Sequence, residues 1–219
     1  MAKEIPVYLF TGFLEGGKTK FIQETLEDPR FNEGDRTLLL VCEEGVEEYD
    51  PSRFYDRKNV FMEVLDDISQ LNEVYLTGLV KKHKADRVVL EYNGMWMLQQ
   101  LYNRMPDDWI IYQEFMLCDA NTFLSYNQNM RQLVVDKLSS CEIVVFNRAG
   151  DKVDKDAFHR VVRGVSRRCD IAYEHKDWLQ VTATIAVKNH PLYQGVGPVL
   201  TATEFGPAEA PEQEVATFY

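Results

Sequence analysis

The chain has 219 residues, of which 45% are hydrophobic and 12% aromatic, so it can bury one substantial core. Its net charge of -11 excludes a general nucleic-acid-binding or anionic-membrane surface, because such surfaces need a basic face. No apolar run approaches the roughly 18 residues of a membrane span, so membrane insertion is not expected. The N-terminal segment has no long apolar stretch of the kind found in signal peptides, and the four cysteines lie far apart. These features predict a cytoplasmic protein.

Short apolar segments alternate along the chain with longer segments of helical periodicity. The strand candidates, in chain order, are 5–11, 36–42, 59–64, 87–93, 109–119 and 142–147, with weaker runs near 170–173 and 178–183. Several are continuous runs of Val, Leu and Ile, as expected for strands covered on both faces. The helix candidates are 18–27, 68–84, 95–104, 121–139 and 153–168. This alternation predicts an α/β fold with a doubly wound, mainly parallel sheet flanked by helices.

The segment VYLFTGFLEGGKTKF joins the first predicted strand to the first predicted helix. Within it Gly12, Gly17, Lys18 and Thr19 match the phosphate-binding pattern G-x-x-x-x-G-K-S/T without a gap. Glycines let backbone N–H groups turn toward phosphates, Lys18 brings a positive charge to them, and Thr19 offers a hydroxyl to Mg²⁺. We therefore predict a P-loop that binds a nucleotide. The alternative is a glycine-rich turn that only begins a helix.

Three neighbouring residues complete the predicted nucleotide site. Gly16 lies between the two ends of the pattern, and Lys20 follows Thr19 at the start of the helix. Glu15 lies inside the loop, where a carboxylate pointing inward would repel phosphate. We therefore expect the Glu15 side chain to face solvent.

Several segments together resemble the CobW/HypB/UreG-type family of P-loop GTPases, most closely its CobW branch. FTGFLEGGKTKF is similar to the family's TGFLGxGKTT, and four later segments follow in the family's order over about residues 5–150. LLLVCEEGVEEYD resembles a switch stretch, RVVLEYNGM the Walker B stretch, CDANTF the VDAxxF stretch, and SSCEIVVFNRAGD the ADVIVLNKxD stretch. The matching residues outside the P-loop and the base motif are Glu43, Gly45, Asp50, Glu91, Gly94, Asp119, Ala120 and Phe123.

The resemblance implies a Mg²⁺-dependent nucleotide site. Thr19, Glu43, Asp50 and Glu91 are the expected metal ligands, and Lys18 with Glu91 the expected catalytic pair. Glu91 would hold Mg²⁺ through water or orient the attacking water. A solvated acidic loop is the alternative for Glu43 and Asp50.

The base-recognition motif departs from the family pattern. NKxD is replaced by Asn147-Arg148-Ala149-Gly150, and Asp151 lies one residue late. Loss of a charged hydrogen bond to guanine would lower affinity by about tenfold to a hundredfold. Asp151 could substitute through a shifted loop, nucleotide choice could be relaxed, or ATP could be the substrate; GTP is favoured narrowly. We assign Asn147, Arg148 and Asp151 to the nucleotide site.

Two further departures concern metal and domain content. The family's CxCC metal motif is absent, since the corresponding interval NVFMEVLDDISQLNEV contains no cysteine. The separate C-terminal domain of the CobW branch does not fit in the remaining sequence. We therefore expect a P-loop nucleotide-binding domain over 1–200, followed by an acidic C-terminal tail over 201–219.

The leading functional hypothesis is a switch protein that hydrolyses GTP, or ATP, and acts on a partner. The family implies metal delivery or metalloprotein and cofactor assembly, with a client protein or a homodimer partner. No arginine finger is identifiable, so a partner could supply one. A regulatory or scaffold subunit with weak or no catalysis is the second hypothesis, and a small-molecule kinase is the third.

Overall fold

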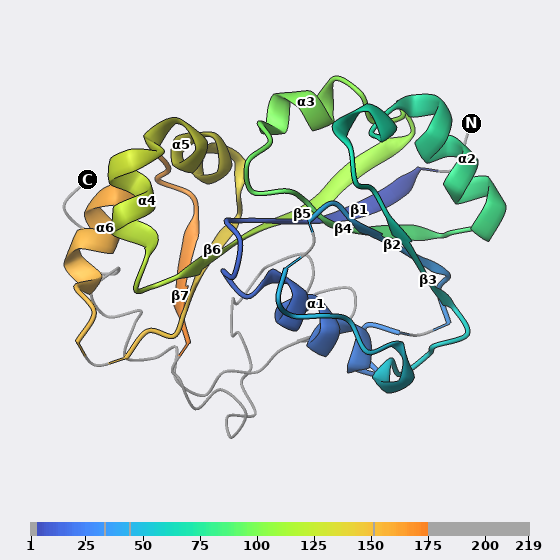
Figure 1. Cartoon of the computed structure of the whole chain (residues 1–219), viewed down its shortest axis with the longest axis horizontal. Coiled ribbons are helices and arrows are strands. Elements are labelled where there is room, and N and C mark those ends of the chain that lie inside the picture. The colour runs from blue at the N-terminus through green and yellow to red at the C-terminus, as the bar shows by residue number, and fades with distance from the viewer. Residues whose placement is uncertain (1–3, 33, 44, 151, 175–219) are drawn as a thin grey trace.

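The computed structural model describes residues 4–32, 34–43, 45–150 and 152–174, and its described strands form one seven-stranded parallel sheet (Figure 1). The strand order is β3-β2-β4-β1-β5-β6-β7. This confirms the predicted parallel α/β sheet. The strands are β1 (Ile5–Thr11), β2 (Thr37–Val41), β3 (Val60–Val64), β4 (Arg87–Glu91), β5 (Trp109–Asp119), β6 (Ile143–Asn147) and β7 (Asp170–Tyr173).

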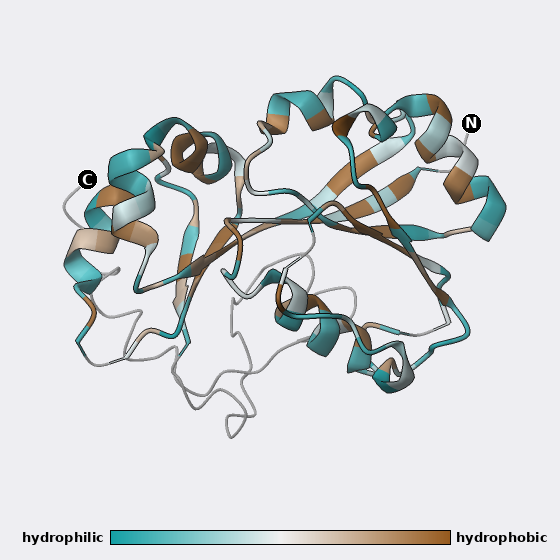
Figure 2. Cartoon of the chain, viewed as in Figure 1, coloured by the Kyte–Doolittle hydropathy of each residue, from teal (hydrophilic) through white to brown (hydrophobic). Residues whose placement is uncertain are grey.

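Helices cover both faces of this sheet, as the continuous apolar strands require. The α-helices are α1 (Lys18–Glu27), α2 (Glu73–His83), α3 (Leu98–Tyr102), α4 (Phe123–Asn129), α5 (Arg131–Ser140) and α6 (Lys155–Arg163), with short 3₁₀ helices η1 (Pro51–Arg53) and η2 (Ile68–Gln70). In Figure 1, α1 lies on one face while α2, α3 and α5 lie on the other. Figure 2 shows brown, apolar strands between helices of mixed colour.

Strand β1 shows why both faces must be covered. Tyr8 and Phe10 belong to the core cluster beneath α1, whereas Val7 and Leu9 belong to the cluster beneath α2 and α3. Alternation places successive side chains on opposite faces, so an apolar strand of this kind is stable only between two layers. On the α1 face, the Phe10 ring stacks on that of Phe115 with centroids 5.0 Å apart.

Two predicted helices are each divided in the structure, and the helices predicted over 95–104 and 153–168 are shorter, as α3 and α6. The predicted helix 68–84 is divided into η2 and α2, because Asn72 lies in an extended conformation and its side chain accepts a hydrogen bond from the Tyr75 N–H. The single helix predicted over 121–139 is wrong. Met130 has φ -131° and ψ 41°, which ends α4 and begins α5 in a new direction.

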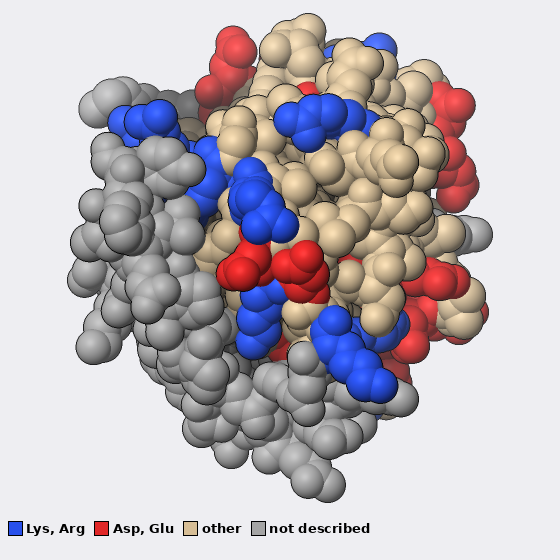
Figure 3. Space-filling model, turned by 90° about the vertical axis from the view of Figure 1, so that its left-hand side faces the viewer, with Lys and Arg blue, Asp and Glu red and all other residues tan. Residues whose placement is uncertain are grey.

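The remaining predicted elements lie partly outside the described residues. The weak strand near 178–183 and the tail over 201–219 fall there, so the domain bounds stay predictions. None of the helices in the described part of the chain is both long and apolar enough to cross a membrane. On the face in Figure 3, acidic and basic side chains are interspersed with uncharged ones.

The sheet topology fixes where a ligand can bind. All the described strands run in the same direction, so their carboxyl ends meet at one edge. The central strand β1 lies between β4 and β5. Strands β2 to β4 lie on one side of β1 and strands β5 to β7 on the other, so the strand order reverses direction at β1. In doubly wound folds ligands bind beyond the carboxyl ends of the strands at this reversal.

Candidate functional site

The loop between β1 and α1 is built by close backbone packing. Gly12 has φ 126°, and a β-carbon there would lie 2.0 Å from the carbonyl oxygen of Leu117 on β5. Gly17 has φ 100°, and a β-carbon there would lie 2.6 Å from the Asn147 side-chain nitrogen. Only glycine combines this backbone conformation with such close approach. The loop therefore curves over the end of the sheet and delivers Lys18 and Thr19 to the first turn of α1.

Lys18 lies at the centre of this loop and is 3% exposed. Its Nζ donates to the carbonyl oxygens of Gly12 and Phe13, both at 2.9 Å, and to Glu43 Oε2 at 2.6 Å. The other oxygen of Glu43 accepts from the Gly94 N–H at 3.2 Å. One carboxylate after β2 thus joins the P-loop lysine to the loop after β4.

Glu91 ends β4 directly beside the first turn of α1 and is 2% exposed. The Thr19 hydroxyl donates to Glu91 Oε1 at 2.9 Å, and the Tyr49 hydroxyl donates to Glu91 Oε2. Burial raises the pKa of Glu91, while the hydrogen bonds from Tyr49 and Thr19 and the charge of Lys18 act in the opposite direction. Burial and the Glu91 charge raise the pKa of Tyr49 well above its usual range, so Tyr49 stays a donor.

Thr19 and Glu91 carry oxygen atoms of the kind that Mg²⁺ prefers, so these two side chains could hold a magnesium ion. Their separation of 2.9 Å fits a small cation held directly or through water. Among the described residues, no group of three or more His, Cys, Asp or Glu side chains could hold a metal ion without other ligands. Phosphate oxygens and water would have to complete the coordination, as is usual for Mg²⁺.

Asp50 lies elsewhere than the metal site that the resemblance implied. Its carboxylate accepts from the backbone N–H of Ser52 at 3.0 Å and from the Ser52 hydroxyl at 2.6 Å, which caps η1. Its backbone N–H donates to Gln23 on α1. The geometry brings Tyr49, and not Asp50, to Glu91. Tyr49 directly precedes Asp50 in the segment that resembles a switch stretch, so the sequence points to the right segment but to the neighbouring residue.

Two adjoining cavities open above the carboxyl ends of the strands. The first, which we call the phosphate lobe, has about 260 Å³ and the second, which we call the base lobe, about 170 Å³. Both are lined by Gly17, Lys20, Glu47, Asn147 and Arg148. The phosphate lobe adds Leu14, Glu15, Lys18, Thr19, Glu43, Gly45, Val46 and Glu91, and the base lobe adds Gly16, Phe21, Glu24, Leu117 and Glu174. The shared lining makes the lobes one continuous site.

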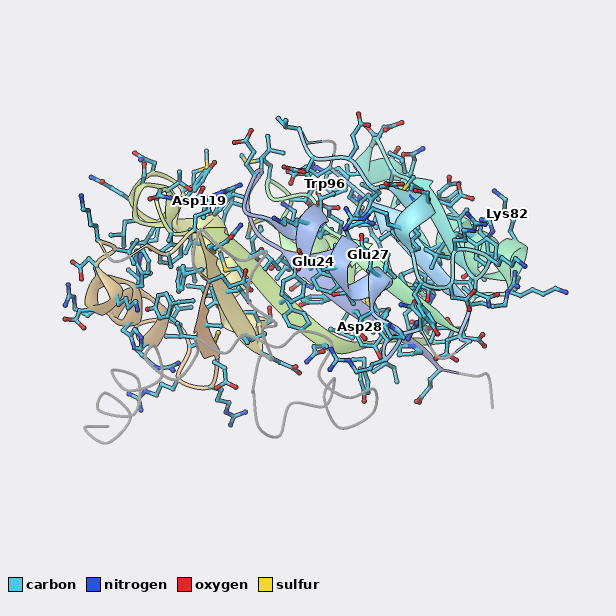
Figure 4. All side chains as sticks on the ribbon, turned by 90° about the horizontal axis from the view of Figure 1, so that it is seen from below. Glu24, Glu27, Asp28, Lys82, Trp96 and Asp119 are labelled. Atoms are coloured by element: carbon cyan, nitrogen blue, oxygen red, sulfur yellow. The ribbon has the colours of Figure 1, made fainter. Side chains whose placement is uncertain are left out.

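The predicted base motif borders both lobes through two of its residues. Arg148 has φ 57°, and its guanidinium donates to the Glu15 carbonyl at 2.9 Å and to Asp119 Oδ2 at 2.7 Å. It therefore ties the P-loop to the end of β5, and Figure 4 shows Asp119 to the left of α1, toward α4. The Asn147 side chain lies against Gly17 and accepts from the Arg148 N–H. Asp151 lies outside the described residues.

The P-loop residues Glu15 and Lys20 are both exposed and line the phosphate lobe. Glu15 has φ 60°, so the loop backbone turns sharply there. The sequence assigned no role to several lining residues: Leu14, Phe21, Glu24, Val46, Glu47, Leu117 and Glu174, nor to Tyr49. Leu14, Val46, Glu47 and Tyr49 lie inside the motif segments but were not singled out there. No motif marks Glu174, which follows β7 and which only the fold brings to the P-loop.

Comparisons by sequence give no match, either to a family model or to a curated protein. Solved structures do match. Zn(II)-bound YjiA GTPase from E. coli aligns with a TM-score of 0.55 and 16% identity, over 91% of this chain and 66% of that chain. A Zn(II)-bound triple mutant of YjiA aligns with a TM-score of 0.56 and 16% identity, over 80% of this chain and 58% of that chain. The hydrogenase maturation factor HypB from Archaeoglobus fulgidus aligns with a TM-score of 0.54 and 14% identity, over 80% of this chain and 82% of that chain.

The chain has the fold of the CobW/HypB-type P-loop GTPases. The expectation drawn from the short motifs is thereby confirmed for the fold. The chain spans less than two thirds of the two YjiA structures. In this P-loop GTPase fold, the phosphate lobe and the base lobe occupy the crevice beyond β1, where the topology directs a ligand.

Proposed function

We propose that this chain is a Mg²⁺-dependent nucleotide switch that binds and hydrolyses GTP and acts on a partner protein. The observation that carries the proposal is the bridge formed by Glu43, whose oxygens bind the Lys18 ammonium and the Gly94 N–H. A γ-phosphate would compete for the same ammonium, because it needs a cation at that place. Nucleotide binding would then free Glu43 and change the loops after β2 and β4 together.

The residues around the phosphate lobe support catalysis by positioning and charge. Lys18 and the backbone N–H groups at the start of α1 would neutralise the β and γ phosphate oxygens. Thr19 and Glu91 would hold Mg²⁺, which when bound lowers the negative charge developing between those phosphates. Glu91, held by Tyr49 and Thr19, would also orient the water that attacks the γ-phosphate. No arginine finger is placed by these contacts, so we expect slow turnover without a partner.

The partner and the biological task follow from the similar proteins. YjiA is a GTPase that binds Zn(II), and HypB is a hydrogenase maturation factor. We propose by analogy that this chain works in the cytoplasm in metal delivery or metalloprotein assembly, with a client protein or a second copy. The described residues lack the thiolate cluster of the family's metal motif, so any transported metal would need other ligands.

A second function is favoured by one specific observation. Position 150, where the family has the base-binding aspartate, is Gly150, and a β-carbon there would meet no atom within 4 Å. A site without a carboxylate there would bind nucleotides with little base preference. The second candidate is therefore a regulatory or scaffold subunit in which the nucleotide, GTP or ATP, mainly stabilises the fold.

Calorimetric titration with GTP, ATP and their diphosphates, with and without Mg²⁺, tests the proposal. We expect Mg²⁺-dependent binding of GTP and slow phosphate release. Binding without phosphate release, alone or with a client, would favour the scaffold function. Absence of any nucleotide binding would overturn both.

A further inference from the structure

The base lobe contains a buried carboxyl group that is far from the P-loop in sequence. Glu174 directly follows β7 and is 6% exposed. Its Oε1 is fully buried and has no hydrogen-bond partner in the part of the chain that the structure describes. A buried polar atom without a partner costs free energy, so its presence needs a reason.

The backbone holds Glu174 firmly at this place. Its N–H donates to the Phe146 carbonyl at 2.9 Å, and its carbonyl accepts from the Ala149 N–H at 2.7 Å. The chain after β7 is therefore hydrogen-bonded to the loop that carries the degenerate base motif. Glu174 lines the base lobe together with Asn147 and Gly17, which also line the phosphate lobe.

The charged groups around the base lobe leave the Glu174 carboxyl free to meet a ligand. Lys20 and Glu24 face the lobe from α1, Arg148 from the loop after β6, and Glu47 from the loop after β2. Arg148 is engaged by Glu15 and Asp119. Burial and the charge of Glu24 raise the pKa of Glu174 well above its usual range, with Lys20 acting in the opposite direction. A ligand with N–H donors would favour the ionised form.

The nucleotide proposed above offers such donors. The Watson–Crick edge of guanine carries two adjacent N–H donors, whereas that of adenine carries one donor beside an acceptor. A carboxylate can accept both hydrogens from guanine. Against adenine, one of its oxygens would face the ring nitrogen N1, which is itself an acceptor, and the two would repel each other. The P-loop fixes the phosphates at one end of the continuous site, so the base would lie in the second lobe.

We propose that Glu174 is the residue that selects guanine in this chain, in place of the aspartate that is missing at Gly150. This inference rests on the proposed nucleotide-binding function and adds a specificity-determining residue to it. The motif after β6 would then position the carboxylate through Ala149, while the carboxylate itself is supplied by the end of β7.

The test is calorimetric binding of GTP, ATP and xanthosine triphosphate to the full chain and to Glu174→Gln. Loss of a charged hydrogen bond should weaken GTP binding by about tenfold to a hundredfold and leave ATP binding unchanged. Xanthosine triphosphate, which has a carbonyl in place of the guanine amine, should bind the variant more tightly, because an amide N–H can donate to it.

Glu114→Gln is the matched control. Glu114 is a buried carboxyl on β5 that is 3% exposed, but it accepts hydrogen bonds from Ser140 and Tyr102 and lies outside both lobes. Its replacement should leave the ratio of GTP to ATP affinity unchanged. Thermal unfolding without nucleotide checks folding: Glu174→Gln should be about as stable as the parent, since it replaces a buried ionisable carboxyl group by a neutral amide of nearly the same shape. If Glu174→Gln does not fold, the ratio of GTP to ATP affinity is measured with Glu174→Asp instead, in which the carboxylate is shorter by one methylene group.

Each result decides the inference. An unchanged GTP to ATP ratio in Glu174→Gln would overturn it, while leaving the nucleotide proposal intact. Equal weakening of GTP and ATP would also overturn it, because that result assigns Glu174 to the ribose. Absence of nucleotide binding to the parent chain would overturn the proposed function, and the inference with it.

Discussion

The two ends of the candidate site are built by different means. At the P-loop end, binding groups come from the backbone and from the first turn of α1, which a short contiguous segment specifies. At the base end, the groups come from the loop after β6 and the residue after β7, which are 27 positions apart when counted from Asn147 to Glu174. The proposed phosphate binding is thus specified mainly by a local segment, whereas the proposed base recognition depends on how the sheet brings distant segments together.

This difference explains how each end can vary. The phosphate-binding loop tolerates little change, because its glycines lie against backbone atoms of β5. A base-binding carboxylate can instead be supplied by any segment that reaches the same volume. The structure therefore explains how the chain could lack an aspartate at position 150 and still choose among nucleotides.

The largest expected effect is at the P-loop end. Lys18→Ala should weaken nucleotide binding by more than about a hundredfold, because it removes the buried ammonium at the centre of the loop, where the proposed phosphates would need a cation. Calorimetry measures this change. Lys82→Ala, which removes an exposed ammonium paired with Glu63, should leave binding unchanged. A Lys18→Ala protein that bound GTP as the parent does would rule out the P-loop site.

A substitution where the two ends meet should affect both. Gly17→Ala would place a methyl group 2.6 Å from the Asn147 side chain at φ 100°, so we expect a loss of about 1–3 kcal/mol in unfolding free energy and weaker nucleotide binding. Chemical denaturation measures the stability. Gly78→Ala is the matched control. Gly78 lies in α2 with open space around it, so this substitution should instead raise the unfolding free energy by about 0.5–1 kcal/mol. Equal effects of the two substitutions would contradict the close packing at Gly17.

Glu114 provides a contrast to Glu174, because its carboxyl already has protein partners. Burial raises the pKa of Glu114 to about 7. Between about pH 4.5, the ordinary value, and pH 7 the folded chain holds this proton while the unfolded chain loses it. Stability should therefore fall as pH rises through that range, by at most about 1.4 kcal/mol per pH unit from this group.

Denaturation of the parent and of Glu114→Gln across this range gives the contribution of Glu114 by difference. The glutamine variant should lack that part of the slope. Identical slopes in the two proteins would show that Glu114 ionises in the folded chain as it does in the unfolded one.

The smallest expected effect concerns the contact between the ends. Arg148→Ala removes the hydrogen bonds to Glu15 and Asp119, and should weaken GTP binding about threefold to tenfold. Thermal stability should change little, because the Arg148 side chain is 43% exposed. Arg160→Ala, at an Arg that is 71% exposed on α6, should change neither quantity. If Arg148→Ala lowered the thermal stability but not the affinity for GTP, Arg148 would have a structural role only.

The sequence predicted the fold well where apolar runs and the P-loop coincide. The bounds of β1, α1 and β5 agree with those expected from the sequence. The break at Met130 was not predicted, because the helical periodicity continues across it and no proline or glycine marks it. The P-loop motif likewise identified Lys18 and Thr19, and the Walker B resemblance identified Glu91; the structure brings the three together.

The rest of the site could not be predicted in the same way. Tyr49 reaches Glu91 because the segment after β2 is hydrogen-bonded to α1 through Asp50 and Gln23. Glu174 follows a strand of four residues and belongs to no recognisable motif. Its nearness to Asn147 comes from the pairing of β6 with β7, which is a property of the sheet.

The contact between Lys18 and Glu43 has a consequence for which anions the site can accept. A buried lysine ammonium would attract any small anion in its surroundings, but here Lys18 already donates to the Gly12 and Phe13 carbonyls and pairs with Glu43 at 2.6 Å. A single phosphate or sulfate ion must displace this carboxylate in return for few new contacts. A nucleoside triphosphate brings several phosphates and a base, and so compensates for the exchange. We therefore expect the Lys18–Glu43 pair to make the site discriminate against simple anions.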